Sequence, residues 1–240
     1  MDTVLRSRSK AVTIGAEQSF CIIGERINPT GRKAFAEQLR EGDLSTVTAD
    51  ALAQVEAGAD MLDVNAGIPL VDEPELLKAM LTTVQEAIDI PVCIDSSVIE
   101  ALEAGLSVYE GRALVNSVTA EDERLEEILP LVARHGAAVI GLANDETGIP
   151  ETPYKRLECA RKIVHAANDH GIATEDVIID PLAMTVGADT EAVTTTLNTI
   201  RVIRDEIGVN MCLGASNVSS GLPQRHVLNA AFLPMAMAAA

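Results

Sequence analysis

The stretch Glu56-Ala-Gly58-Ala-Asp60-Met-Leu-Asp63-Val-Asn65 contains the pattern that decides the fold. Glycine tolerates the left-handed turn that commonly ends a helix, so Gly58 marks the passage from a helix into a strand. The apolar run that follows ends at Asp63 and Asn65, which are two residues apart and therefore share one face of that strand. This order of helix, glycine, apolar strand and polar strand end predicts one repeat of an α/β protein.

The same unit recurs along the chain and predicts seven strands. They are expected near residues 20–24, 60–65, 91–95, 113–116, 137–143, 177–180 and 211–214. Strands that alternate with helices form a parallel sheet, and this many repeats favour a TIM-type (βα)8 barrel. The carboxyl ends of all strands in such a barrel lie at one face. We therefore expect the polar strand ends to converge on one pocket.

The last βα unit of such a barrel is missing from the pattern. A barrel needs eight strands, whereas the chain continues after residues 211–214 as an apolar, helix-like run through Phe232 and Pro234 to Ala240. We expect a single barrel domain over residues 1–240 without its final strand and helix. An open or disordered seam between the first and the seventh strand should result.

The composition argues against several classes of function. A formal net charge of −18 and the lack of a Lys/Arg cluster disfavour nucleic acid and anionic membranes as partners. The sequence contains neither a secretory signal pattern nor an apolar run long enough to span a bilayer, so we expect a cytoplasmic protein. The four cysteines stand far apart and are expected to be reduced. No histidines have metal-binding spacing, so no metal site is expected.

Several polar strand ends have two interpretations from their chemistry alone. Asp95 either binds a ligand or acts as an anion at the start of the next helix. The amide of Asn116 must be satisfied by a ligand or by neighbouring backbone. Asp63 and Asn65 could form a hydrogen-bond network that supports the barrel floor. Asp180 is followed by a proline that fixes the turn and keeps its carboxylate at the strand end.

The segment Gly214-Ala-Ser216-Asn217-Val-Ser-Ser-Gly221 follows the seventh expected strand, where barrels often bind phosphate. A lyase or aldolase that acts on a phosphorylated substrate therefore stays open as an alternative. No Lys or Arg stands inside the segment, although Arg225 is close. No strand end offers a lysine for a Schiff base, which weakens this alternative.

Seven motifs, in order, resemble those of the pterin-binding methyltransferases, which include methyltetrahydrofolate:corrinoid methyltransferase and the folate module of cobalamin-dependent methionine synthase. They are Ile-Ile-Gly-Glu25-Arg26-Ile-Asn28-Pro-Thr-Gly31, Gly58-Ala-Asp-Met-Leu-Asp63-Val-Asn65, Cys-Ile-Asp95-Ser-Ser, Val-Asn116-Ser-Val, Thr147-Gly-Ile-Pro150, Ile-Asp180-Pro-Leu and Gly214-Ala-Ser-Asn217-Val-Ser219. The resemblance covers about residues 20–240 and implies a (βα)8 barrel. Dihydropteroate synthase shares that barrel, but its seventh strand normally carries Ser-Arg-Lys where this chain has Ser216-Asn217-Val218. Pterin synthesis is therefore the weaker alternative.

The resemblance implies an enzyme that moves a methyl group between N5 of tetrahydrofolate and the cobalt of a corrinoid. It places Asp95, Asn116 and Asp180 on the hydrogen-bonding edge of the pterin. Asn217 would be the catalytic residue, forming a hydrogen bond near N5. The other substrate-binding positions are expected to be Asp63, Asn65, Gly214 and Ser216.

The resemblance also implies partners. The chain has no Asp-x-His-x-x-Gly motif of the kind that binds a corrinoid, so the corrinoid is expected on a partner protein. Relatives are often homodimers, and the apolar end around Phe232 and Met235 could join such a contact. Glu25, Arg26 and Asn28 could line the barrel mouth, although Arg26 could equally pair with a neighbouring carboxylate. A non-catalytic folate-binding module of a larger methyltransferase assembly is the third hypothesis.

Overall fold

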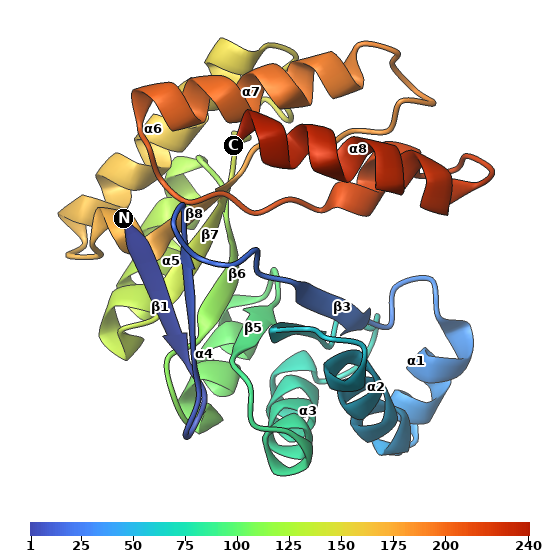
Figure 1. Cartoon of the computed structure of the whole chain (residues 1–240). Coiled ribbons are helices and arrows are strands. Elements are labelled where there is room, and N and C mark those ends of the chain that lie inside the picture. Colours follow the sequence, from blue (N-terminus) through green and yellow to red (C-terminus); the bar gives the residue numbers. More distant parts are fainter. The chain divides into compact units, whose positions relative to one another are not determined.

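The computed structural model describes residues 1–240 and contains a sheet whose strands alternate with helices (Figure 1). The strands are β3 (Ile23–Ile27), β4 (Met61–Asn65), β5 (Val92–Asp95), β6 (Leu114–Val118), β7 (Ala138–Leu142) and β8 (Val177–Asp180), hydrogen bonded in this order. The pairs from β3 to β6 are parallel. Consecutive parallel strands need a crossover connection, which helices supply here. The expected α/β fold with a parallel sheet is therefore confirmed.

Eight α-helices connect or follow the strands. They are α1 (Lys33–Arg40), α2 (Ser45–Glu56), α3 (Glu73–Ala87), α4 (Ile99–Val108), α5 (Asp122–His135), α6 (Pro153–Asp169), α7 (Ala192–Glu206) and α8 (Arg225–Ala239), with short 3-10 helices η1 (Thr174–Asp176) and η2 (Ala215–Ser219). Side-chain caps fix the start of two of them. Asp72 accepts from the Glu75 amide at 3.2 Å before α3, and Thr152 accepts from the Lys155 amide at 3.4 Å before α6. No helix combines the length and the apolar character that a membrane span requires.

The chain divides into two compact units, and β6 and β7 each contribute to both. The first contains residues 2–117 and 130–139. Its core includes the buried face of α3, where Leu77 and Leu81 are fully covered. A side chain at Gly105 of α4 would come within 2.9 Å of Leu81 and 3.1 Å of Ile94, so only glycine permits this close packing.

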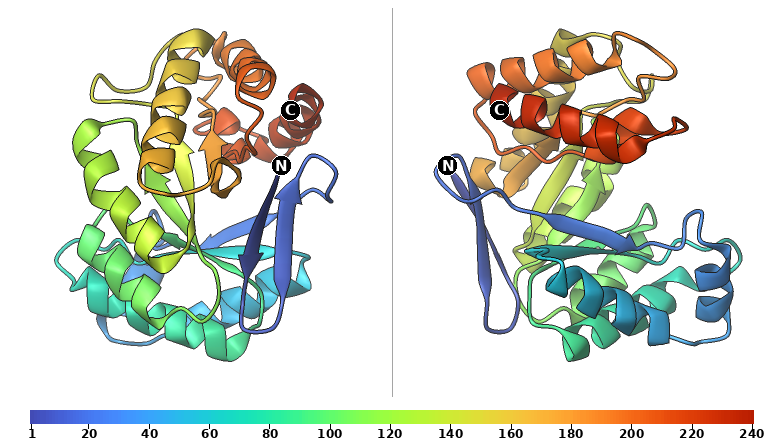
Figure 2. Two further views of the ribbon diagram at one scale, coloured as in Figure 1. Left: turned by 90° about the vertical axis from the view of Figure 1, so that its left-hand side faces the viewer. Right: turned by 45° about the vertical axis from the view of Figure 1, so that its right-hand side comes forward.

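The second unit contains Met1 and residues 118–129 and 140–240. Here α7 and α8 lie side by side (Figures 1 and 2) and enclose an apolar cluster that includes Leu197, Ile200 and Phe232. Because Phe232 is only 3% exposed within this cluster, its expected contribution to a contact between copies is wrong. Met235 is 48% exposed, and the homodimer itself stays a prediction.

The strand expected at residues 211–214 is also wrong. Only Met211 forms a parallel bridge, with Ile179, and the Cys212 amide donates to the Ile179 carbonyl at 3.0 Å. The Ala215 amide then bonds to the Leu213 carbonyl at 2.8 Å, so the chain turns into η2 before a ladder can form. The first predicted strand, near 20–24, lies instead at Ile23–Ile27. Closure into a barrel, its seam and the single domain stay predictions.

An N-terminal hairpin was not expected from the sequence. Strands β1 (Asp2–Arg6) and β2 (Ala11–Gly15) pair antiparallel, as Figure 2 shows. Arg6 and Arg112 exchange backbone hydrogen bonds of 3.0 and 2.9 Å, and the Tyr109 hydroxyl donates to the Arg6 carbonyl at 2.9 Å. These bonds attach the hairpin to the segment that leads into β6. The two strands pair locally, from Asp2 with Gly15 to Arg6 with Ala11, whereas the attachment depends on partners far along the chain that no sequence motif indicates.

Gly111 allows the hairpin to come this close. Its φ is 143°, and a Cβ there would lie 2.2 Å from the Arg6 carbonyl oxygen. We expect Gly111→Ala to lower the free energy of unfolding by about 2 kcal/mol or more, measured by urea denaturation. Gly42→Ala is the matched control, because Gly42 has a φ of 78° and nothing within 4 Å of the added Cβ. Equal losses in the two variants would show that the contact with Arg6 contributes nothing.

Candidate functional site

The ends of β4, β5 and β6 bring four of the predicted side chains to one edge of the sheet. In the parallel register Asn65 pairs with Asp95, and Asp95 pairs with Asn116. Asp63 stands two residues before Asn65 and therefore points to the same face. The strand register alone thus gathers two carboxylates and two amides within the first unit.

Each carboxylate of this group is held by an amide from a different strand. Asn65 Nδ2 donates to Asp95 Oδ2 at 2.8 Å, and Asn116 Nδ2 donates to Asp63 Oδ2 at 3.1 Å. The Asn65 side-chain oxygen accepts from the Gly67 amide at 2.8 Å, which fixes the orientation of its own amide. The second oxygen of Asp63, Oδ1, is buried and has no hydrogen-bond partner. A buried polar atom without a partner is costly, and a polar group of a ligand would satisfy it.

Burial also changes the acidity of these carboxyls. Desolvation raises the pKa of Asp63, which is only 3% exposed, and the nearby charge of Asp95 raises it further. The pKa of Asp95 is raised as well, first by burial and then by Glu25 and Glu73, while the hydrogen bond from Asn65 opposes the shift. The two neighbouring carboxyls therefore hold a proton more tightly than exposed ones would.

The loop after β3 is fixed by ion pairs in the same unit. Arg26 Nε lies 3.4 Å from Asp50 Oδ1, and Arg32 Nη1 lies 2.6 Å from Asp50 Oδ2. Arg26 therefore pairs with a neighbouring carboxylate, which was one of its two expected roles. The Asn28 side chain accepts from the Thr30 amide at 2.9 Å and shapes the turn that follows.

Asp180 ends β8 in the second unit, as the sequence predicted. Its Oδ1 accepts a hydrogen bond of 2.8 Å from the amide of Leu182, so the carboxylate fixes the turn directly behind it. Leu182 has a φ of 65°, an unfavourable left-handed conformation for a residue with a Cβ. The position of Asp180 is therefore tied to the conformation of this turn.

The segment from Gly214 to Ser219 forms η2 and its entrance. A Cβ on Gly214 would lie 2.9 Å from Asn217 Nδ2, so glycine leaves room for the Asn217 amide. Arg225 Nη2 donates to the Ser216 carbonyl at 2.9 Å, and the backbone N–H of Asn217 donates to the Gly214 carbonyl at 3.0 Å. These donors are used within the segment itself. A phosphate cradle is therefore the weaker interpretation.

The eight predicted site residues fall into two groups. Asp63, Asn65, Asp95 and Asn116 belong to the first unit, where hydrogen bonds connect them in pairs. The second unit carries Asp180, Gly214, Ser216 and Asn217. Convergence of the two groups on one pocket stays a prediction.

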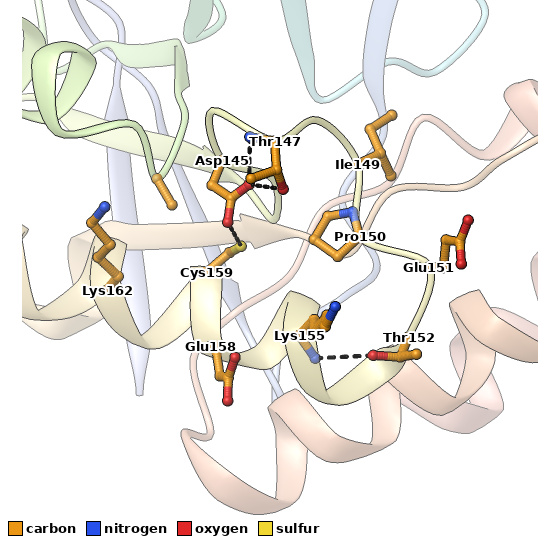
Figure 3. Close-up of a pocket in the computed structure, with 11 residues that line it drawn as sticks. Asp145, Thr147, Ile149, Pro150, Glu151, Thr152, Lys155, Glu158, Cys159 and Lys162 are labelled. Atoms are coloured by element: carbon orange, nitrogen blue, oxygen red, sulfur yellow. Dashed lines mark hydrogen bonds between the residues drawn. The ribbon is translucent and has the colours of Figure 1, made fainter.

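A cavity of about 530 Å³ lies in the second unit between the loop after β7 and one face of α6 (Figure 3). Asp145 and Thr147 line it from the loop, and Lys155, Cys159 and Lys162 line it from α6. Its charges are mixed, and Lys162 pairs with Asp122 at 2.7 Å. None of the eight predicted residues lines this cavity, so it is distinct from the predicted site.

Two residues beside the predicted groups were missed. Glu73 accepts a hydrogen bond from Ser96 and lies near enough to Asp95 to raise its pKa. Arg156 of α6 is buried against the turn after Asp180. Glu73 follows the helix cap Asp72, which offered a signal, whereas nothing in the sequence around Arg156 distinguishes it from a surface arginine.

Known sequences resemble the chain over nearly its whole length. The family described as pterin binding enzyme matches residues 24–240. Methylcorrinoid:tetrahydrofolate methyltransferase of Eubacterium limosum is 34% identical over 222 residues, which cover 90% of this chain and 80% of that protein. Methionine synthase of Mycobacterium tuberculosis is 32% identical over 236 residues, or 93% of this chain. The chain spans only 20% of the length of that second relative.

Solved structures share the fold at lower identity. Dihydropteroate synthase from Xanthomonas albilineans in complex with 7,8-dihydropteroate matches with a TM-score of 0.76 at 20% identity, covering 99% of this chain and 90% of that one. The same enzyme with 4-aminobenzoic acid gives a TM-score of 0.72 at 17% identity, with coverages of 99% and 90%. These matches relate the fold to a TIM barrel. Because the family matches residues 24–240 and a relative is 34% identical over 90% of the chain, this protein belongs to the pterin-binding enzyme family.

Proposed function

We propose that this protein transfers a methyl group between N5 of tetrahydrofolate and the cobalt of a corrinoid carried by a partner protein. The observation that carries the proposal is the set of carboxylate and amide pairs at the ends of β4, β5 and β6, which leaves the buried Asp63 Oδ1 without a donor. The methylcorrinoid:tetrahydrofolate methyltransferase relative, at 34% identity over 80% of its length, supports the choice of reaction.

The chemistry of a pterin suits these residues. Its pyrimidine edge presents adjacent N–H donors, and a carboxylate can accept two of them in parallel. Asp95 would accept from this edge, while Asn116, whose Nδ2 already donates to Asp63, would offer its side-chain oxygen as a further acceptor. Asp180 would accept from another part of the edge. Each bond to a charged acceptor would contribute about 1.5–3 kcal/mol to binding.

Asn217 would act on the reacting nitrogen. When the methyl group leaves folate, the electron pair of the broken C–N bond stays on N5, which must then gain a proton or a strong hydrogen bond. The Asn217 amide, which lies over Gly214, would donate to N5 and stabilise this charge. Such assistance typically accelerates a step by about 10²–10⁴-fold. The same contact would serve transfer in the reverse direction.

Two other functions remain alternatives. A dihydropteroate synthase-like activity agrees with the fold, but the matches to that enzyme are at 20% identity or below in the two structures compared, and Ser216-Asn217-Val218 replaces the Ser-Arg-Lys expected there. A non-catalytic folate-binding module agrees with the match to one fifth of a methionine synthase.

Titration with methyltetrahydrofolate, followed by a reduced corrinoid, separates these functions. We expect saturable binding and then loss of the cobalt(I) absorbance as the methyl group is transferred. Binding without transfer would favour the non-catalytic module. Absence of binding would reject both the transferase and the module, and condensation of a pterin with 4-aminobenzoate would support the synthase.

Two substitutions should separate binding from chemistry. We expect Asp95→Asn to weaken methyltetrahydrofolate binding by about 10–100-fold, because a charged acceptor is lost. Asn217→Ala should lower the single-turnover transfer rate by about 10²-fold or more and change affinity much less. Asn198→Ala is the control, because it removes a half-buried amide of α7 whose oxygen accepts from Arg201 at 2.9 Å and which lies outside the predicted site. Equal losses of rate and affinity in Asn217→Ala would reduce Asn217 to a binding residue.

Because the pKa of Asp63 is raised, its contribution to the stability of the folded protein should fall as pH rises. The folded protein holds this proton after the unfolded chain has lost it, so the contribution of Asp63 to stability is full below the unfolded pKa and disappears as pH rises through the folded one. Asp63→Asn should therefore gain thermal stability relative to wild type on going from pH 5 to pH 9. Glu17→Gln, the same charge change at an exposed site, should show no such trend. A constant difference between Asp63→Asn and wild type at both pH values would contradict this account.

A further inference from the structure

Arg156 is a buried cation that the proposed chemistry does not use. It belongs to α6, and its side chain is among the few charged groups in the core, with the residue only 3% exposed. Burial lowers the pKa of Arg156, and the charge of Asp180 opposes that shift. A buried charge is costly unless its donors are well satisfied, so the contacts of this guanidinium need an explanation.

The guanidinium donates to three backbone carbonyls. Arg156 Nε donates to the Pro150 carbonyl at 2.8 Å, and Nη1 donates to the carbonyls of Pro181 and Leu182 at 2.9 and 2.7 Å. Pro150 lies in the loop between β7 and α6, whereas Pro181 and Leu182 form the turn after β8. One side chain therefore joins two successive strand-end loops.

The turn held by Arg156 is the one that positions Asp180. The Leu182 amide donates to Asp180 Oδ1 at 2.8 Å, and its carbonyl accepts from Arg156 and, at 3.1 Å, from Thr196 Oγ1. Both the amide and the carbonyl of Leu182 are therefore hydrogen bonded while the residue adopts its left-handed conformation. Loss of the guanidinium would leave three carbonyls without this donor and would release the turn that carries the Asp180 carboxylate.

We propose that Arg156 is a positioning residue that fixes the Pro181–Leu182 turn and thereby holds the Asp180 carboxylate in the geometry that binds the pterin. The inference rests on the proposed function, because it assumes that Asp180 contacts the pterin. Arginine suits this role better than lysine, since its planar fork fixes the directions of several donors at once.

The test measures the dissociation constant for methyltetrahydrofolate in Arg156→Gln, Arg156→Lys and a matched control. Arg161→Lys is that control, because Arg161 stands on the same helix but pairs at the surface with Glu206 at 2.6 Å. We expect affinity to fall by about tenfold or more in Arg156→Gln, by less in Arg156→Lys, and by less than about twofold in Arg161→Lys.

A double-mutant cycle with Asp180→Asn separates positioning from general support of the fold. If Arg156 acts through Asp180, Arg156→Gln should weaken binding by no more than about threefold in the Asp180→Asn background. The same loss in both backgrounds would overturn the role of Arg156, as would unchanged affinity in Arg156→Gln. If the wild-type protein binds no methyltetrahydrofolate, both the proposed function and the proposed role of Arg156 are rejected.

A second variant covers the possibility that Arg156→Gln does not fold. Thr196→Val removes the other donor to the Leu182 carbonyl, keeps the shape of a residue that is 1% exposed, and leaves the arginine in place. We expect cooperative unfolding and binding weakened by about two- to fivefold. Wild-type affinity in a folded Thr196→Val protein would contradict a role for the Leu182 carbonyl in holding Asp180.

Discussion

The parallel register of β4, β5 and β6 is the constraint on which the candidate site depends. Because Asn65 pairs with Asp95 and Asp95 with Asn116, the side chains at the strand ends face one another without help from a long loop. A shift of one residue in either pairing would turn the affected side chain to the opposite face of the sheet. The backbone hydrogen bonds between the strands thus set the positions of the side chains that would bind a ligand.

The same arrangement creates an electrostatic conflict. Two carboxyls are buried close together, and the amides of Asn65 and Asn116 compensate for part of the cost by donating to them. Asp63 Oδ1 nevertheless stays buried and unpartnered. A protein under selection for stability alone would replace such a group, so its presence agrees with a role in binding a polar group of a ligand.

The second unit uses a different device for its carboxylate. Asp180 stands before a proline and accepts a hydrogen bond from the turn that follows it, and the buried guanidinium of Arg156 donates to two carbonyls of that turn. Here a buried side chain from a helix replaces strand register as the source of rigidity. Strand register thus positions the carboxylates of the first unit, whereas side-chain hydrogen bonds to a turn position the carboxylate of the second.

The sequence by itself determined the α/β class, the order of six of the strands and the polar residues at their ends, because glycine turns and apolar runs act locally. It placed the first strand three residues too early, and it predicted a strand at residues 211–214 that early turning into η2 prevents. Only the tertiary structure showed that Phe232 is covered by its own chain, that the hairpin attaches to Arg112 and that Arg156 bridges two loops. Each of these depends on partners far away in the sequence, and local patterns of residues cannot specify which distant groups will meet.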